Sequence, residues 1–159
     1  MHLYLLRHAE AQHPPGCADF DRPLSAAGIL EAQALAATLA ADYSLTGKRC
    51  ILASTAARTQ QTAAIFTQEN HFPENSLQHI PEIYEASAID LLKIINNQAE
   101  DIEHLIIIGH NPGLSYLIHY ISGIAVTLKT AQLAHLSLEE GITFPLLSAS
   151  TANLVRIIG

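Results

Sequence analysis

The sequence predicts a three-layer α/β/α sandwich built on a mixed, mostly parallel β-sheet. Short apolar segments alternate with segments of helical periodicity over residues 2–122, which is typical of parallel strands joined by helices. Two later apolar segments, 134–138 and 152–158, have no helical pattern between them, so we expect an antiparallel pair that closes the sheet. The length of 159 residues and an apolar content of 49% predict a single domain over residues 1–159.

The first predicted strand covers residues 2–7, and a polar loop follows it up to Arg22. Ser25 is predicted to cap the next helix, because its hydroxyl can accept from a free amide of the first turn. Apolar side chains recur along that helix at helical spacing. They are Ala32, Leu35, Ala36 and Leu39.

Two more strand and helix pairs follow. Residues 49–53 are predicted as a strand and 54–68 as a helix, and residues 77–80 as a short third strand. Ser87 and Asp90 resemble a capping box at the head of a helix, although aspartate replaces the usual glutamate.

Residues 105–108 form the strongest strand signal in the chain. They are continuously apolar and β-branched, as in a central strand covered on both faces. Gly109 is predicted to end this strand, and Asn111 to cap a helix with Pro112 at its first position and an end near Ser122.

Composition excludes several classes of function. A net charge of -7 argues against a general nucleic-acid binder or a binder of anionic membranes, since both need a broad basic face. The apolar run at the amino terminus is too short for a signal sequence, and no later run approaches membrane-spanning length, so we expect a cytoplasmic protein. Cys17 and Cys50 lack zinc or disulfide spacing, and we expect an exposed loop thiol and a buried thiol, respectively.

Histidine and arginine side chains follow the predicted strands where ligand sites form in open α/β sheets. Arg7 and His8 follow the first strand, and His110 follows the strongest one. Arg58 lies in the first turn of the second helix, from which its guanidinium can reach across the strand ends. We expect these four side chains to form one cationic pocket. Asn111 and the amides near it offer further groups for an anion.

A phosphoryl group is the anion that this set of residues fits best. A neutral imidazole is a competent nucleophile at phosphorus, so a phosphohistidine intermediate can divide hydrolysis into two steps. Arginines neutralise phosphoryl oxygens without competing as nucleophiles. We therefore expect the pocket to bind phosphorylated molecules and to release inorganic phosphate.

Other residues near this pocket have less defined roles. Arg22 either lines the pocket or pairs with Asp19 or Asp21, and the sequence favours neither. His13 is the one other histidine that the loop carries close to the site. The chain lacks an HExxH segment and a carboxylate at ligand spacing beside the pocket histidines, so we expect neither a metal nor another cofactor.

Five segments of the chain together resemble the histidine phosphatase superfamily, also called the phosphoglycerate mutase-like group. The similarity spans nearly the whole chain, and within the superfamily it is strongest to the small SixA-type phosphohistidine phosphatases. The segments that carry it are Arg7-His8-Ala9, Arg58 with Gln61-Thr62-Ala63, Gly109-His110-Asn111-Pro112-Gly113-Leu114, Asp19-Phe20-Asp21-Arg22-Pro23-Leu24 and Tyr84-Glu85-Ala86-Ser87.

The resemblance implies a phosphoglycerate mutase-like fold and a metal-independent phosphatase. It implies that His8 is the nucleophile and that Arg7, Arg58 and His110 bind the phosphoryl group. Mutase relatives place a glutamate that acts as the general acid in a segment that aligns with residues 80–86. Glu82 fits the spacing slightly better than Glu85, so the resemblance implies Glu82 as the acid.

The expected substrate is phosphohistidine on a signalling or phosphorelay protein. Imidazole leaves from phosphorus far more readily than an alkoxide, so such a substrate needs little help from an acid. The short chain also has little sequence for a lid over the pocket. One alternative is a small-molecule phosphomonoesterase or mutase of the same superfamily, and another is a non-catalytic module that docks phosphorylated partners.

Overall fold

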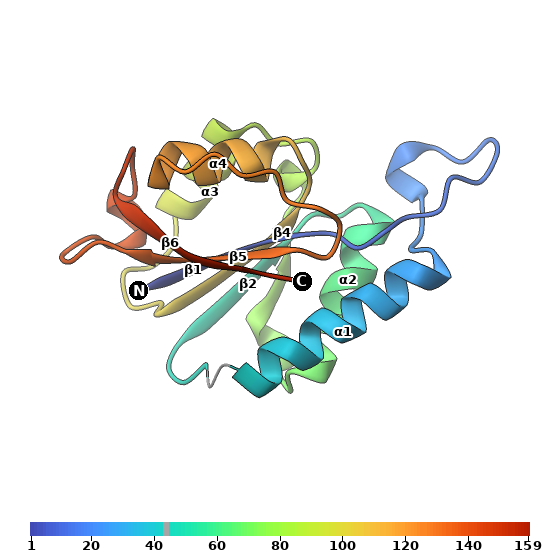
Figure 1. The fold of residues 1–159 in the computed structure, drawn as a ribbon, viewed down its shortest axis with the longest axis horizontal. Helices are drawn as coiled ribbons and strands as arrows, with labels where there is room; N and C mark the ends of the chain where they lie inside the picture. The colour runs from blue at the N-terminus through green and yellow to red at the C-terminus, as the bar shows by residue number, and fades with distance from the viewer. Residues whose placement is uncertain (43–44) are drawn as a thin grey trace.

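The computed structural model describes residues 1–42 and 45–159, which form a six-stranded sheet between two layers of helices (Figure 1). The strand order is β3-β2-β4-β1-β5-β6. Neighbours among the first four strands are parallel, whereas β5 is antiparallel to both β1 and β6. The predicted mixed, mostly parallel sheet is confirmed. The strands are β1 (His2–Arg7), β2 (Arg49–Ala53), β3 (Leu77–His79), β4 (His104–Gly109), β5 (Leu133–Leu138) and β6 (Ala152–Ile158).

Each face of the sheet packs against two helices (Figure 1). Successive side chains of a strand point to opposite faces. In β1, Leu3 and Leu5 therefore belong to the core beneath α3 and α4, and Tyr4 and Leu6 to the core beneath α1 and α2. All four side chains are buried, as expected for a strand covered on both sides. The helices are α1 (Ala26–Asp42), α2 (Ala57–Glu69), α3 (Ala88–Asn96) and α4 (Gly113–Ser122).

Two predicted helix caps are confirmed. The amide of Gly28 donates to the Ser25 hydroxyl at 2.9 Å, and the amide of Asp90 donates to the Ser87 hydroxyl at 3.3 Å. Each bond satisfies one of the amides that the first helical turn leaves unpaired.

The predicted cap at Asn111 is wrong. Pro112 is the residue that precedes the first turn of α4, and no side chain caps this helix. The Asn111 side chain is occupied elsewhere, because its amide donates to the carbonyl of Leu128 at 2.7 Å and its oxygen accepts from the Ser115 hydroxyl at 2.8 Å. The partner at Leu128 lies 17 residues away, so local turn chemistry could not reveal it.

The two cysteines meet the expected degrees of exposure only in part. Cys50 is buried as predicted, whereas Cys17 is half-buried rather than exposed. Within the described part of the chain, no helix combines the length and the apolar character that crossing a bilayer requires.

Candidate active site

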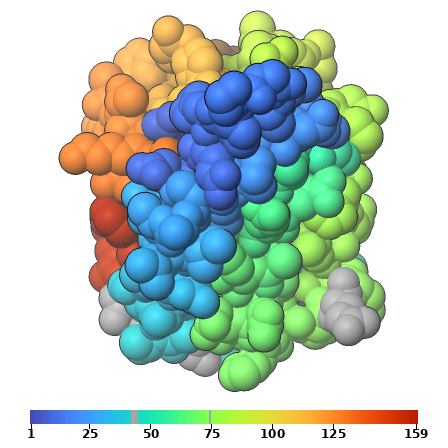
Figure 2. Space-filling view, turned by 90° about the vertical axis from the view of Figure 1, so that its right-hand side faces the viewer, coloured from blue at the N-terminus to red at the C-terminus, as the bar shows by residue number. Residues whose placement is uncertain are grey.

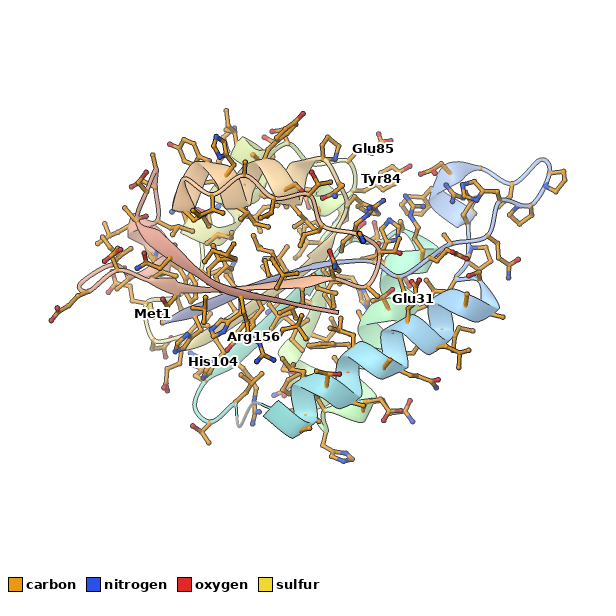
Figure 3. All side chains as sticks on the ribbon, viewed as in Figure 1. Met1, Glu31, Tyr84, Glu85, His104 and Arg156 are labelled. Carbon is orange, nitrogen blue, oxygen red and sulfur yellow. The ribbon has the colours of Figure 1, made fainter. Side chains whose placement is uncertain are left out.

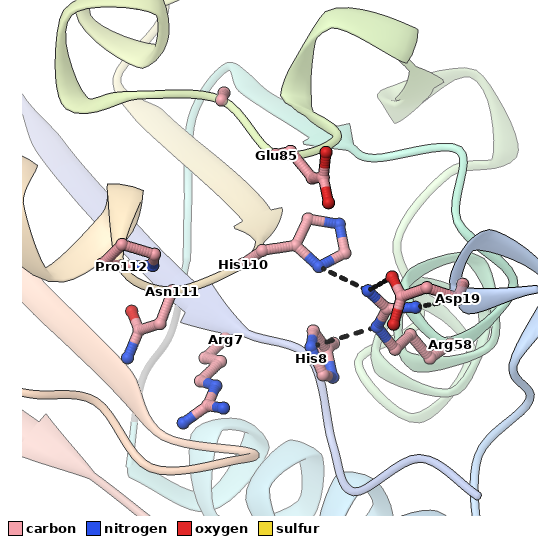
Figure 4. Close-up of a pocket in the computed structure, with 9 residues that line it drawn as sticks. Arg7, His8, Asp19, Arg58, Glu85, His110, Asn111 and Pro112 are labelled. Atoms are coloured by element: carbon pink, nitrogen blue, oxygen red, sulfur yellow. Dashed lines mark hydrogen bonds and ion pairs between the residues drawn. The ribbon is translucent and has the colours of Figure 1, made fainter. Parts of the chain in front are cut away.

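A pocket of about 440 Å³ opens where β1 and β4 end (Figure 4). Parallel pairing places Arg7 beside Gly109, so the residues that follow each strand are neighbours. The rings of His8 and His110 have their centres 5.1 Å apart. The structure thus brings together the four side chains that the sequence assigned to one pocket. The lining residues are Arg7, His8, Asp19, Arg58, Glu85, Ala86, His110, Asn111 and Pro112.

Hydrogen bonds orient the His8 ring. Its Nδ1 lies 2.8 Å from the carbonyl oxygen of Ala9, which can only accept, so Nδ1 carries the proton. Its Nε2 accepts from Nε of Arg58 at 3.2 Å. Burial, together with the positive charges of Arg58 and Arg7, lowers the pKa of His8 to about 4 despite the opposing effect of the hydrogen bond to Ala9. At neutral pH the ring is therefore neutral, with a lone pair on Nε2.

Arg58 is almost fully buried and is held by the loop that follows β1. Its terminal nitrogens donate to the carbonyl oxygen of Asp19 and, at 2.9 Å, to the carboxylate of the same residue. Arg22 and Tyr84 also donate to this carboxylate, at 2.7 and 2.9 Å. Partial desolvation raises the pKa of Asp19, but the hydrogen bonds from Tyr84, Arg22 and Arg58 outweigh it and lower the pKa to about 2.

Asp19 was not predicted to line the pocket. The sequence offered it only as a possible ion-pair partner of Arg22, and the structure shows that pair at 2.7 Å. The family resemblance includes residues 19–24, and this resemblance is the signal that could have indicated Asp19 as a pocket residue. Figure 2 shows the amino-terminal loop in blue on the surface, beside the orange segment that follows α4.

Arg7 has a donor that no protein group satisfies. One terminal nitrogen donates to the carbonyl of Leu128 at 2.9 Å, the same oxygen that accepts from Asn111. Its Nε is buried without a hydrogen-bond partner among the described residues. Burial also lowers the pKa of Arg7. Because a buried unpaired donor is unfavourable, this guanidinium is suited to receive an anionic oxygen.

His110 is buried at the base of the pocket. Its Nε2 lies 2.8 Å from the Ser54 hydroxyl, and its Nδ1 lies 3.4 Å from a terminal nitrogen of Arg58. Burial, with smaller contributions from the neighbouring His8 and Arg58, lowers the pKa of His110 to about 3. The ring is neutral in this unliganded pocket, and a bound phosphoryl oxygen would favour a proton on Nδ1. Ser54, which orients the ring, was not singled out by the sequence.

Comparison with known proteins shows the family of the chain. A model of the histidine phosphatase superfamily (branch 1) matches residues 3–91, more than half of the chain. The chain belongs to this superfamily. The matched range of this histidine phosphatase contains Arg7, His8 and Arg58, whereas His110 lies beyond it.

Relatives and solved structures agree with this assignment. The Mycobacterium tuberculosis protein Rv1276c is 31% identical over 122 residues, which cover 77% of this chain and 73% of the relative. A protein from Agrobacterium tumefaciens assigned as phosphohistidine phosphatase SixA is 28% identical, with a TM-score of 0.79 over 99% of this chain and 97% of that one. The protein histidine phosphatase SixA complexed with tungstate has the same fold, with a TM-score of 0.79, 20% identity and coverage of 100% and 97%. The predicted phosphoglycerate mutase-like fold and the likeness to SixA-type proteins are confirmed. The chain is a phosphatase that acts on phosphorylated substrates.

The structure places the remaining candidate residues of this histidine phosphatase differently. Arg22 does not line the pocket and instead contacts Asp19, the carbonyl of Gln12 and the ring of His13. Glu82, the residue expected to act as the acid, is exposed in a short 3-10 helix outside the pocket. Glu85 lines the pocket in its place. The three-residue difference arises because the chain turns after Ile83, with Glu85 in a left-handed conformation at a φ of 54°.

Residues that could bind a metal do not gather at this site. Within the described ranges, no three or more histidine, cysteine or acidic side chains are grouped so that they could hold a metal ion. The pocket chemistry available from the chain is therefore that of imidazoles, guanidiniums and two carboxylates.

Proposed function

We propose that this histidine phosphatase hydrolyses phosphohistidine on a partner protein through a covalent phosphate on Nε2 of His8. One observation carries the proposal. A neutral imidazole with its lone pair on Nε2 lies in one pocket with two guanidiniums, one of which has a buried donor without a partner. This arrangement is suited to a nucleophile that attacks an anion.

In the first step, Nε2 of His8 attacks phosphorus in line with the leaving nitrogen. The bond between phosphorus and that nitrogen breaks, and its electron pair stays on the leaving imidazole. Arg7, Arg58 and His110 bind the phosphoryl oxygens and stabilise their charge. The phosphorylated His8 ring is cationic, and its Nδ1 proton stays bonded to the carbonyl of Ala9.

In the second step, water attacks phosphorus and the bond to Nε2 breaks. The electron pair returns to His8 and inorganic phosphate leaves. Asn111 lines the same pocket and is proposed to contact the phosphoryl group. The metal-free reaction is part of the proposal and is tested by activity that persists in excess chelator.

Leaving-group chemistry supports phosphohistidine as the substrate. An imidazole leaves with a conjugate acid of pKa about 6.5, against about 15.7 for water as the reference for an alkoxide. Glu82, the acid that the mutase relatives imply, does not line the pocket. The similarity to the Agrobacterium protein assigned as a phosphohistidine phosphatase points in the same direction.

The proposed partner is a phosphohistidine-bearing signalling protein of the cytoplasm. The net charge of -7 disfavours nucleic acids and anionic membranes as partners. A second candidate function is the hydrolysis of small phosphomonoesters, which Glu85 favours because a carboxyl group in the pocket could protonate an alkoxide. Turnover of a phosphohistidine peptide compared with sugar phosphates distinguishes the two functions.

The decisive experiment is to trap the intermediate with phosphorus-labelled substrate and to map the labelled residue. We expect the label on His8 and an acid-labile bond. His8→Ala should lose at least about 10³-fold in turnover and still bind phosphate or tungstate, because the guanidiniums remain. His13→Ala, a histidine of the same loop outside the pocket, is the control and should retain activity. A label elsewhere, or normal turnover by His8→Ala, would exclude His8 as the nucleophile.

A further inference from the structure

Glu85 is an acidic side chain in a pocket that binds anions. Its side chain lines the pocket above His110 (Figure 4) and has no hydrogen-bond or ion-pair partner within the described part of the chain. The backbone at Glu85 has a φ of 54°, a left-handed conformation that non-glycine residues seldom adopt. The structure therefore maintains an unfavourable conformation that keeps a free carboxylate at the site.

The other carboxylate of the pocket has a different environment. Asp19 is bonded to Arg58, Arg22 and Tyr84, so its charge is already compensated. Glu85 has no such partner, and its negative charge repels a phosphoryl dianion and any alkoxide that leaves from it. An uncompensated carboxylate at this position favours a substrate that carries a positive charge beside the phosphoryl group.

Phosphohistidine carries such a charge when the ring nitrogen that is not phosphorylated is protonated. We propose that the Glu85 carboxylate accepts a hydrogen bond from this protonated nitrogen of the substrate and thereby selects phosphorus–nitrogen over phosphorus–oxygen bonds. The inference rests on the proposed function and assigns the substrate preference of that site to one residue.

The proton balance of the first step explains why a protonated substrate ring reacts more readily. While the ring is protonated, breakage of the bond to phosphorus releases a neutral imidazole, and the proton stays on the nitrogen that Glu85 binds. Without that proton the leaving group would be an imidazolide anion, which leaves far less readily. Glu85 therefore acts by keeping the substrate in its reactive protonation state, and it transfers no proton.

This role predicts a specific dependence on pH. A nearby negative charge raises the pH at which the bound substrate ring loses its proton. Removal of that charge should therefore move the alkaline limit of activity to lower pH. Several other charged or titratable groups face the same space, and they remain unchanged in a Glu85 variant. They are Arg7 and His8 after β1, Asp19 and Tyr84 from the two loops, Arg58 on α2 and His110 after β4.

The test compares Glu85→Gln with Glu82→Gln, a neighbouring exposed glutamate outside the pocket. Values of kcat/KM are measured from pH 6 to pH 9 on a phosphohistidine peptide and on para-nitrophenyl phosphate. For Glu85→Gln on the peptide, we expect a loss of about ten-fold at pH 8 and an alkaline limit lower by about one pH unit. We expect the ratio of its kcat/KM on the peptide to its kcat/KM on the aryl phosphate to fall by about ten-fold at pH 8, and Glu82→Gln to match the wild type on both substrates.

Inorganic phosphate binding provides the folding control. Glu85→Gln should bind phosphate at least as tightly as the wild type, because a repulsive charge is removed. An equal loss on both substrates at every pH, or no loss on the peptide, would overturn the role of Glu85. Failure of the wild-type protein to hydrolyse the peptide would overturn the proposed function together with this inference, and that result is independent of the variants.

Discussion

The chemistry of the pocket requires a neutral His8 ring, and the surroundings of this ring keep it neutral. Burial and the adjacent guanidiniums of Arg58 and Arg7 together lower the pKa of His8 to about 4. Protonation of Nε2 removes the lone pair that attacks phosphorus. Since that protonation occurs near pH 4 rather than near 6.5, the nucleophile stays available over the whole physiological range.

Arg58→Ala tests this coupling at the residue scale. We expect KM to rise and kcat to fall, with about a 10²-fold loss in kcat/KM, because a charged donor to the phosphoryl oxygens is lost. Loss of its positive charge also raises the pKa of His8, so the acid limit of kcat/KM should move to higher pH. Steady-state kinetics from pH 4 to pH 8 measure both effects.

Arg22→Ala is the matched control, because Arg22 also pairs with Asp19 but does not line the pocket. We expect a smaller loss of activity in this variant. An unchanged kcat in Arg58→Ala would show that this guanidinium does not contact the reacting group.

At the scale of elements, the start of α4 fixes the turn that carries Glu85. Gly113 packs directly against the backbone carbonyl of Ala86, and a β-carbon at position 113 would overlap with it. Ser115, in the first turn of the helix, bonds to Asn111 and to the amide of Leu128, which places the oxygen that Arg7 contacts. One helix terminus thus positions both sides of the pocket.

Gly113→Ala should therefore affect stability and activity together. We expect the free energy of unfolding to fall by about 2 kcal/mol, since the added methyl group meets backbone that cannot rotate away. Urea denaturation measures this loss. Tyr116→Ala on the same helix is the control, because its side chain is 64% exposed and should change stability by no more than about 0.5 kcal/mol. Equal stability of Gly113→Ala and the wild type would contradict the close approach.

At the scale of the whole molecule, three histidines form a second group away from the pocket. His2 and His104 begin β1 and β4 at the end opposite the pocket, where Figure 3 labels His104, and His135 lies on β5 beside Tyr4. Nε2 of His135 is 3.0 Å from Nδ1 of His2, and the rings of His2 and His104 stack at 5.4 Å. Burial lowers the pKa of all three, that of His135 to about 4, with further contributions from neighbouring positive charges. Both ends of the sheet therefore contain neutral, partly buried imidazoles.

The lowered pKa values of these histidines predict that the fold loses stability in acid. An unfolded histidine binds a proton below about pH 6.5, whereas His135 in the folded state resists protonation until about pH 4. Stability is thus fully present above pH 6.5 and declines as the pH falls from there toward 4. His135→Gln should reduce the decline between pH 7.5 and pH 4.5 by about 2 kcal/mol. Urea denaturation of both proteins at the two pH values measures it, and an identical decline would contradict the prediction.

The layered fold and the four pocket residues could be predicted from the amino-acid sequence alone. Apolar runs and helical periodicity are local properties of the chain. Arg7 is the last residue of β1, and His8 and His110 directly follow β1 and β4. The parallel register of β1 and β4 then brings these strand ends together without further information.

The acidic residues that enter the pocket and the partners of the Asn111 side chain depend on packing between distant segments and could not be predicted from the sequence. Asp19 reaches Arg58 across 39 residues, Glu85 depends on a left-handed turn against α4, and Asn111 bonds to Leu128 instead of capping its helix. These positions depend on contacts between segments that are distant in the chain. Local sequence preferences do not describe such contacts, because the free energy of these contacts arises only when the elements pack together.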